Sequence, residues 1–463
     1  MLPAGHRDPA ALGLLTRRDD VRVAFQTFGC KANQYDTERM RQELEARGAS
    51  TVDLAEGAEL CVVNTCTVTN QADAQARRFI RRVRREHPDV KVVVAGCSAA
   101  LRAEEYRAMD EVSEVVAGHD PVAVATAVDP PRRLVQLGTR KRLDELDREP
   151  VGGEILLRRE GASRGWLKIQ DGCDRKCAFC ATRLARGRSR SREADEVIRE
   201  AGRLSRTHPE LVLTGIHIGH YGLDLSEPLS LSGLLARLLE EVPETRFRLG
   251  SIEATEIDDL MVELLERSGG RVAPHLHMPM QSGADPVLRR MRRWHTREMY
   301  RVRALQIVER LAAAGSPTVD GTPVLGFGAD IITGFPGETD EDHAATVALV
   351  EELPFTYLHV FPFSPREGTV AADLVREMPV PQRVAGERSR ELREMVQAKE
   401  AVYRTRRAGS RARVVLEGDG RTALTEDYLR LGVRGPLPED RRVLLDAELV
   451  MMDGELAAVL SKG

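Results

Sequence analysis

The sequence predicts an α/β protein with three parts: an open parallel sheet, a partial barrel of six strand–helix units and a small C-terminal β-barrel. Three observations lead to this expectation. Short apolar runs rich in β-branched residues alternate with helical stretches near the N-terminus, a longer alternation follows, and short strand-like runs close the chain. Of the 463 residues, 42% are hydrophobic and 30% are charged. A soft scale of about 150 residues per domain gives roughly three packed domains.

The first part, expected over residues 21–130, contains three apolar runs that each end at a cysteine. They are VRVAFQTFGC at Cys30, AELCVVNTC at Cys66 and VKVVVAGC at Cys97, here called the N-terminal triplet. Helical stretches separate the runs, so a parallel, Rossmann/flavodoxin-like sheet with right-handed crossovers is expected. Ligands bind outside the carboxyl ends of such strands, so the three thiols should meet at one edge. Cys61 lies inside a run and is expected to be an ordinary buried residue.

The second part, expected over residues 160–400, alternates strands and helices as a partial (β/α)6 barrel does. A connector rich in Pro, Gly, Arg and Asp, with a strand at 154–158, leads into it. Its six candidate strands are WLKIQDGC, ELVLTGIHIG, RFRLGSIEAT, HLHMPMQSG, GADIITGFPG and YLHVFPFSP. A long charged helix is expected over 381–407. Short alternating runs such as RARVVLEG then predict a small all-β module over 405–463.

A second group of cysteines follows the first barrel strand. Cys173, Cys177 and Cys180, here called the barrel triplet, are spaced C-x3-C-x2-C. The chain has seven cysteines, and an odd, clustered set favours metal chemistry over a disulfide framework. Thiolates are the usual ligands of iron–sulfur clusters, and three thiolates on four irons leave one iron open. The alternative is a zinc site completed by His119 or His217, although neither has zinc-finger spacing.

Arginines gather in two places. A helix starting near Asp73 carries one apolar stripe, and the rest of its circumference is here called the arginine face: Arg77, Arg78, Arg81, Arg82, Arg84 and Arg85. A solvated charged face is the ordinary alternative, but no acid interrupts the run as it would in a face of helical ion pairs. The run therefore suits phosphate contacts. A second group follows the barrel triplet and is expected to guide RNA toward it: Arg183, Arg186, Arg188, Arg190 and Arg192.

Several segments resemble motifs of the radical-SAM methylthiotransferases, in the family's order. They are FGCKANQYDTERM, VVNTCTVTNQAD, VVVAGC, LKIQDGCDRKCAFC, ARGRSRSR, GIHIGHYG, HMPMQSGAD, GADIITGFPGETDED and FPFSPREGT. The resemblance runs from about Val21 to the C-terminus, and residues 1–20 have no counterpart. The family's Pro-Tyr pair before ARG is replaced by the sequence at 182–184. The last module resembles the TRAM domain, an RNA-contacting β-barrel in which Arg413 and Arg430 would face RNA.

The resemblance implies two 4Fe-4S clusters and S-adenosylmethionine as cofactors. Matched residue by residue, the barrel triplet would hold the cluster that binds and cleaves S-adenosylmethionine. The N-terminal triplet would hold an auxiliary cluster whose open iron carries the sulfur to be methylated and transferred, and a second S-adenosylmethionine would supply the methyl group. The residues expected near S-adenosylmethionine, with loop packing, turns or ion pairing as their alternative roles, are Phe179, Gly215, Glu253, Ser282 and Gly334.

Within this family, four segments resemble most the subgroup that adds a methylthio group to carbon 2 of N6-threonylcarbamoyladenosine next to the tRNA anticodon: CKANQYDTE, NTCTVTNQADAQAR, SIEATEI and LTEDYLRL. The subgroups acting on isopentenyladenosine in tRNA or on a ribosomal-protein aspartate are alternatives, and a non-catalytic, zinc-containing RNA-binding protein is an alternative of another class. The implied partners are the tRNA anticodon stem-loop, an electron donor of the reductase or flavodoxin type and a sulfur source. A run of about 18 apolar residues and a secretory signal are both missing, so a cytoplasmic protein without a membrane span is expected.

Overall fold

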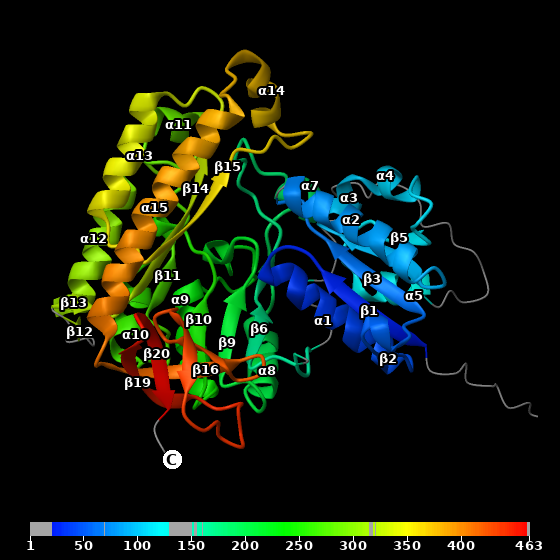
Figure 1. The fold of residues 1–463 in the computed structure, drawn as a ribbon, viewed down its shortest axis with the longest axis horizontal. Helices are drawn as coiled ribbons and strands as arrows, with labels where there is room; N and C mark the ends of the chain where they lie inside the picture. The colour runs from blue at the N-terminus through cyan, green and yellow to red at the C-terminus, as the bar shows by residue number, and fades with distance from the viewer. Residues whose placement is uncertain are drawn as a thin grey trace, which may run out of the picture.

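The computed structural model describes residues 21–68, 70–128, 151, 155–159, 161–313, 318–319 and 321–460. Residues 1–20 and most of the expected connector lie outside this part, and residues 155–159 have no regular secondary structure, so the strand expected at 154–158 is not seen in them. Figure 1 shows the N-terminal sheet beside a larger barrel, with the small C-terminal β-barrel packed at one end of the latter. Among the described helices, none is both long enough and apolar enough to span a membrane.

The N-terminal domain is a five-stranded parallel sheet with the order β2-β1-β3-β4-β5. Its strands are β1 (Arg22–Thr27), β2 (Ser50–Thr51), β3 (Leu60–Thr65), β4 (Lys91–Gly96) and β5 (Glu114–Val115). Its helices are α1 (Lys31–Ala46), α2 (Asn70–Glu86), α3 (Cys97–Leu101), α4 (Ala103–Arg107) and α5 (Pro121–Val128). Met40 of α1 and Val124 of α5 pack on one face of the sheet, and Phe79 of α2 and Tyr106 of α4 pack on the other. Because both faces are covered, β3 is buried along its whole length. The expected parallel, Rossmann/flavodoxin-like sheet is confirmed.

The second part is an open barrel of six parallel strands. They are β6 (Arg164–Lys168), β9 (Glu210–Thr214), β10 (Arg246–Leu249), β11 (His275–His277), β14 (Gly326–Thr333) and β15 (Tyr357–Pro362). β6, β9 and β10 form one sheet and β11, β14 and β15 another, and isolated bridges at Phe247↔Val272 and Ser251↔His277 connect them. β6 and β15 are the two free edges, so the partial (β/α)6 barrel is confirmed.

Helices cover the outside of this barrel, and Figure 1 shows α12, α13 and α15 lying along β11, β14 and β15. The expected long charged helix is α15 (Gln382–Arg407). The other helices of this part are α7 (Thr182–Arg186), α8 (Ala194–Leu204), α9 (Leu231–Glu241), α10 (Asp259–Arg267), α11 (Asp285–Arg290), α12 (Arg297–Ala313), α13 (Asp340–Glu352) and α14 (Val370–Glu377). The short strands β7 (Gln170–Asp171) and β8 (Arg190–Ser191) pair with each other, as do β12 (Thr318–Val319) and β13 (Thr322–Pro323). Ile331 and Val360 belong to the apolar core under the helices, so the alternating residues Asp330 and His359 face the barrel interior.

The C-terminal strands close into the expected small barrel, with the order β16-β17-β18-β20-β19. They are β16 (Arg411–Glu417), β17 (Thr422–Thr425), β18 (Arg430–Arg434), β19 (Leu445–Met452) and β20 (Glu455–Leu460). Buried Glu210 binds Arg246 Nε at 2.6 Å and Arg248 Nε at 2.8 Å. The Nη1 atoms of these two arginines donate to backbone carbonyls of the small barrel, at Arg413 (2.7 Å) and Glu426 (2.9 Å). Since β10 begins at Arg246, the small barrel caps the amino-terminal end of the large one.

Candidate functional site

The N-terminal triplet lies at the carboxyl edge of the parallel sheet. Cys30 follows β1, Cys66 follows β3, and Cys97 begins α3 directly after β4. β1, β3 and β4 are neighbours in the sheet, so their ends bring the thiols together. Burial raises the pKa of the Cys97 thiol to about 12; nearby Arg186 opposes this rise, and Cys66 and Cys30 add to it. The structure thus gathers the three cysteines at one edge.

Two glycines make room for this triplet. Gly29 has a φ of +102°, and a Cβ atom there would lie 2.4 Å from Cys66 Sγ. Gly96 has a φ of +96°, and its Cβ would lie 2.2 Å from Asn64 Oδ1. Only glycine accepts both a left-handed backbone and so little space. Glycine is therefore required before Cys30 and before Cys97, because the strand ends approach each other closely.

A buried asparagine, Asn33 of α1, ties these loops together. Its Nδ2 donates to the carbonyls of Phe28 and Thr65, both at 2.9 Å. Its Oδ1 lies 3.5 Å from Cys97 Sγ and accepts a hydrogen bond from Arg186 Nη2 at 2.6 Å. Sequence reasoning missed Asn33, because a polar residue one turn into a helix carries no distinctive pattern.

The barrel triplet lies in the loop between β7 and α7. The backbone N–H of Cys180 donates to the carbonyl of Cys177, and that of Cys173 donates to the carbonyl of Gly187, each at 3.2 Å. Burial raises the pKa of the Cys173 thiol to about 12; the backbone N–H of Arg175 opposes the rise, and Cys180 and Cys177 add to it. These three thiols therefore also lie together, in one short loop.

Hydrogen-bond donors point at sulfur atoms of both triplets. The Val68 N–H donates to Cys66 Sγ at 3.3 Å, Arg186 Nε to Cys97 Sγ at 3.1 Å, and Arg293 Nη1 to Cys177 Sγ at 3.5 Å. Hydrogen bonds and positive charge stabilise a thiolate, which is the form that an iron–sulfur cluster binds. Both triplets therefore fit three-thiolate ligation of a cluster.

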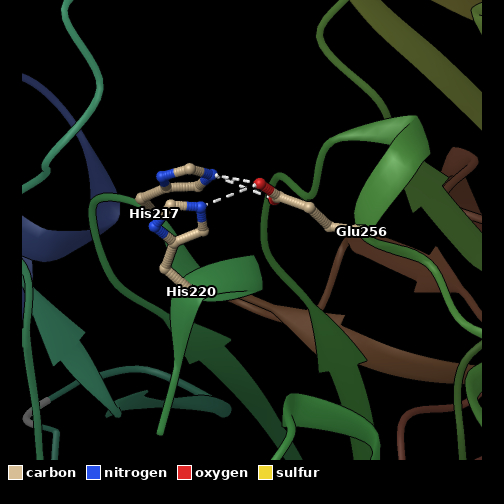
Figure 2. Close-up of side chains that lie close together, drawn as sticks. All are labelled: His217, His220 and Glu256. Atoms are coloured by element: carbon tan, nitrogen blue, oxygen red, sulfur yellow. Dashed lines mark hydrogen bonds and ion pairs between the residues drawn. The ribbon is translucent and has the colours of Figure 1, made fainter. Parts of the chain in front are cut away.

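Figure 2 shows two histidines, His217 and His220, grouped around the carboxylate of Glu256; this group lies next to the barrel triplet. His217 Nδ1 lies 3.6 Å from Cys173 Sγ, and His217 Nε2 lies 2.9 Å from each carboxylate oxygen of Glu256. His220 stacks on His217 with ring centroids 4.0 Å apart and reaches Glu256 at 3.3 Å. A carboxylate that fixes a histidine next to a metal ligand is a common way to orient that ligand. The sequence pointed to His217 only as a zinc candidate, and it gave no sign of Glu256.

Glu253, expected near S-adenosylmethionine, forms a buried ion pair with Arg293, the residue that contacts Cys177. Burial raises the pKa of Glu253 to about 6, although Arg293 counteracts this. The carboxyl group is therefore next to the barrel triplet, and the ion pair that sequence reasoning kept as its alternative role is present.

The other residues expected near S-adenosylmethionine lie at strand ends or in the cysteine loop. Phe179 is partly buried against the cluster that contains Phe335 and Phe363. Ser282 is buried, and its hydroxyl accepts from Ala284 N–H at 3.2 Å. Gly215 is packed against the Gln170 carbonyl, 2.8 Å from where its Cβ would be, and Gly334 has a φ of +70° and abuts Ala385 of α15. Close packing explains these two glycines without a ligand.

Both triplets border the interface between the N-terminal domain and the barrel, and Arg186 of the barrel bonds Cys97 Sγ across it. Arg366, in the loop after β15, is buried and donates to the carbonyl of Val68 at 2.8 Å. Burial lowers the pKa of Arg366 and nearby Arg102 adds to this, whereas Cys66 and Cys180 raise it. Asp73 raises the pKa as well, and the guanidinium ties the loop after β15 to the segment that follows Cys66. The two thiol sites form a single region between the domains.

The arginines have three different environments. Arg78, Arg81, Arg82, Arg84 and Arg85 of the arginine face are exposed, as are Arg188, Arg413 and Arg430. Arg77 pairs with Asp73 and Glu105, and Arg430 pairs with Glu417. Arg190 is half-buried and donates to the carbonyl of Arg186. Arg186 and Arg192 are buried, which corrects the expectation that they guide RNA.

A second polar group lines the barrel interior. Asp330 Oδ1 lies 3.1 Å from His277 Nε2 and 3.3 Å from His359 Nδ1. The two histidines hold the pKa of Asp330 well below its usual range, although burial opposes them. The Tyr357 hydroxyl lies 3.0 Å from His277 Nδ1. This interior can therefore offer several hydrogen bonds to a polar ligand.

Comparisons with known proteins agree with this arrangement. Residues 22–118 match "Uncharacterized protein family UPF0004", and residues 167–350 match the "Radical SAM superfamily". The threonylcarbamoyladenosine tRNA methylthiotransferase MtaB of Rickettsia prowazekii is 34% identical over 89% of this chain and 91% of its own length. MtaB of Bacillus subtilis is 38% identical over 76% of this chain and 75% of its own length.

A relative with a different printed substrate is also similar. The tRNA-2-methylthio-N(6)-dimethylallyladenosine synthase of Oceanobacillus iheyensis is 29% identical over 89% of this chain and 79% of its own length. Among solved structures, the radical S-adenosylmethionine methyltransferase TsrM of Kitasatospora setae has a TM-score of 0.55 and 16% identity, covering 77% of this chain and 78% of that one. That likeness shows a shared fold.

Proposed function

Because the chain belongs to the radical-SAM methylthiotransferase family, we propose that it adds a methylthio group to carbon 2 of N6-threonylcarbamoyladenosine next to the anticodon of tRNA. The observation that carries this proposal is the presence of two three-cysteine sites at one interface, where Arg186, six residues after Cys180, bonds Cys97 Sγ at 3.1 Å. A single site would serve radical chemistry alone. Two sites at one interface allow sulfur to be held close to the place where a radical is formed.

The barrel triplet would hold the 4Fe-4S cluster that binds S-adenosylmethionine, and the N-terminal triplet would hold the auxiliary 4Fe-4S cluster. S-adenosylmethionine and the two clusters supply the radical, the methyl group and the bound sulfur. This chain's own residues hold and orient them. Arg186 and Arg293 place N–H groups and positive charge on one sulfur of each site. Cys66 and Cys97 are buried and Cys173 and Cys177 are half-buried, which limits the access of bulk water to both sites.

The barrel interior supports the threonylcarbamoyl substrate over an isopentenyl one. His277, Asp330, His359 and Tyr357 offer hydrogen-bonding groups there. A threonylcarbamoyl group carries a carboxylate, a hydroxyl and two N–H groups, which can use such partners. An isopentenyl group is apolar and could form no hydrogen bonds with these side chains.

Exposed arginines support an RNA substrate. The five exposed members of the arginine face, together with Arg188, Arg413 and Arg430, provide positive charge on the N-terminal domain, beside the barrel triplet and on the small barrel. Such charge binds phosphates through the release of counterions. The proposal also includes a reductase- or flavodoxin-type electron donor, a separate sulfur source and a cytoplasmic location.

The decisive experiment measures nucleosides in tRNA from cells that lack the gene. We expect N6-threonylcarbamoyladenosine to accumulate and its 2-methylthio derivative to disappear, and a plasmid copy to restore it. A loss of 2-methylthio-isopentenyladenosine instead would assign the protein to that substrate. Unchanged tRNA together with an unmodified ribosomal-protein aspartate would assign it to protein modification.

A second experiment tests the clusters. After anaerobic reconstitution the protein should be brown and contain about eight irons, four for each triplet. A preparation that never exceeds four irons would contradict the two-cluster assignment. A colourless protein with bound zinc would favour a structural, non-catalytic role.

A further inference from the structure

We propose that Arg186 is a positioning residue for the auxiliary cluster: it reaches from the barrel domain into the N-terminal domain, bonds the sulfur of Cys97 and sets the reduction potential of the cluster held there. The inference rests on the proposed function, because it requires a cluster at the N-terminal triplet. It assigns a role in cluster tuning to an arginine that sequence pattern placed on the RNA surface.

Every nitrogen of the Arg186 side chain has a partner. Nε donates to Cys97 Sγ at 3.1 Å, and Nη1 lies 3.0 Å from both oxygens of Asp171. Nη2 donates to Asn33 Oδ1 at 2.6 Å and to Asp36 Oδ2 at 2.8 Å. The planar guanidinium is therefore fixed in one orientation, and the Nε–H group is aimed at the sulfur.

The charges around Arg186 show why an arginine is needed there. Lys168 Nζ binds both Asp36 and Asp171 at 2.7 Å, so two cations and two carboxylates are packed together with almost no exposed surface. The two cations balance the two carboxylates. Lysine carries the same charge as arginine, but its three donors leave from one nitrogen and cannot span a sulfur, an amide oxygen and two carboxylates.

This network of hydrogen bonds and ion pairs connects residues next to the barrel triplet with residues of the N-terminal domain. Arg186 lies on α7, in the segment that follows the barrel triplet, and Asp171 lies just before Cys173. Asn33, Asp36 and Cys97 belong to the N-terminal domain. A shift of the cysteine loop in the barrel would therefore be transmitted to Cys97 through one rigid side chain.

The expected consequence is electrostatic. The potential of an iron–sulfur cluster rises with hydrogen bonds to its sulfurs and with nearby positive charge, because both stabilise the extra electron of the reduced form. Arg186 supplies both to Cys97, which is buried. Removal of the N–H···S bond should therefore make the auxiliary cluster harder to reduce.

The experiment isolates the auxiliary cluster in the full-length protein by replacing the three barrel cysteines with alanine. In this parent, Arg186→Lys keeps the charge but loses the fixed Nε–H donor. A redox titration followed by electron paramagnetic resonance should show, at a fixed potential, about a tenfold lower ratio of reduced to oxidised cluster, which corresponds to 59 mV for one electron. About four irons should remain bound.

The matched control is Arg192→Lys. Arg192 is also buried at this interface, but its hydrogen bonds go to the Lys168 carbonyl at 2.8 Å, Glu200 at 3.1 Å and the Tyr35 hydroxyl of the N-terminal domain at 3.4 Å. The reduction potential of the auxiliary cluster in Arg192→Lys should equal that in the parent. An equal shift in both variants, or an unshifted Arg186→Lys protein that retains its four irons, would overturn the inference.

A second variant decides the matter if Arg186→Lys fails to retain iron. Asp36→Asn keeps Arg186 and removes a negative charge from the network, so the reduced fraction should increase at the same potential. No increase would contradict the proposed tuning. A parent protein that binds no iron at all contradicts the proposed function instead, so the two failures are distinguishable.

Discussion

The two cysteine triplets represent two ways to build a site for the same kind of cluster. The N-terminal triplet gathers three cysteines from distant points of the chain, and the sheet alone brings them together. The barrel triplet is a single short loop whose spacing defines it. Each triplet has one exposed member, Cys30 or Cys180, but the other two are buried in the N-terminal triplet and half-buried in the barrel triplet. The first site therefore depends on the fold of a whole domain, and the second depends on local backbone geometry.

The largest expected effect tests whether the two sites are independent. Cys97→Ala and Cys177→Ala should each lower the iron content from about eight to about four, because two thiolates do not hold a cluster and the other site is separate. Both variants should lose methylthio transfer to background. Iron analysis and tRNA nucleoside analysis measure these outcomes.

Cys61→Ala is the control, since Cys61 is buried inside β3 and belongs to the apolar core. It should keep about eight irons and its activity. Loss of all iron in either of the other single variants would show that one cluster depends on the other.

The next effect tests the dependence of the N-terminal site on close strand ends. In Gly29→Ala, the new Cβ would lie 2.4 Å from Cys66 Sγ at a φ of +102°. We expect loss of most of the auxiliary iron and a destabilisation of about 1–3 kcal/mol, measured by iron analysis and chemical unfolding. Gly48→Ala has a φ of +94° but no atom within 4 Å of its Cβ, so it should show the backbone strain and keep its iron. Equal iron loss in both variants would contradict the role of close contact.

A smaller effect tests the support of the barrel triplet. Glu256→Gln removes the carboxylate that holds His217 beside Cys173. Loss of such an outer partner typically costs about 10–100-fold in activity. The rate of 5′-deoxyadenosine formation should fall accordingly, whereas the auxiliary cluster should keep its iron. Glu263→Gln, on the exposed surface of α10, should have the wild-type rate, and a normal rate in Glu256→Gln would remove this pair from the site.

The arginine face tests whether the domain of the N-terminal triplet also binds tRNA. Arg81→Glu with Arg85→Glu should weaken tRNA binding and reduce the salt dependence of the affinity, by a slope of about 0.9 for each lost phosphate contact. Binding titrations at several salt concentrations measure this slope. Arg267→Glu, equally exposed on α10, is the control. An unchanged slope in the double variant would place the tRNA elsewhere.

The smallest effect is a pH dependence of the barrel site. The pKa of Glu253 rises from 4.5 to about 6 on folding, so the native protein binds the proton more tightly than the unfolded chain. This contribution is complete below pH 4.5 and is lost as the pH rises toward 6, and it amounts to about 2 kcal/mol. Unfolding of the iron-free protein at several pH values should show the decrease, and Glu253→Gln should abolish it. If Glu253→Gln shows the same decrease in stability with pH, another group causes that decrease.

Sequence patterns predict the parts of these sites that follow from periodicity or spacing. Strand runs that end at Cys30, Cys66 and Cys97 place the thiols at one sheet edge, because all parallel strands end on the same side. The contacts between distant segments do not have such a signal. Arg366 bonds the Val68 carbonyl, two residues after Cys66, from another domain, and Glu256 meets His217 only after the barrel has formed.

Arg186 shows why a run of like charges is an incomplete guide. Its neighbours Arg188 and Arg190 are exposed and half-buried, so the run resembles a solvated surface. Arg186 instead turns inward because Asp171 and Asp36 stand there. Neither acid is close enough in the sequence pattern to reveal the pairing. The exposure of the arginine face of α2 is easier to predict, because the opposite side of this helix is apolar and buried.

The contact between the two barrels affects which residues of the small barrel can change during evolution. Arg246 and Arg248 hold the small barrel by its main-chain carbonyl oxygens, and every amino acid supplies such an oxygen. Side chains on the outer surface of the small barrel can therefore change without loosening its attachment. The side chains that must be kept are the few that face the large barrel, such as Glu417 and Asp427, which bond Arg164 and Arg407.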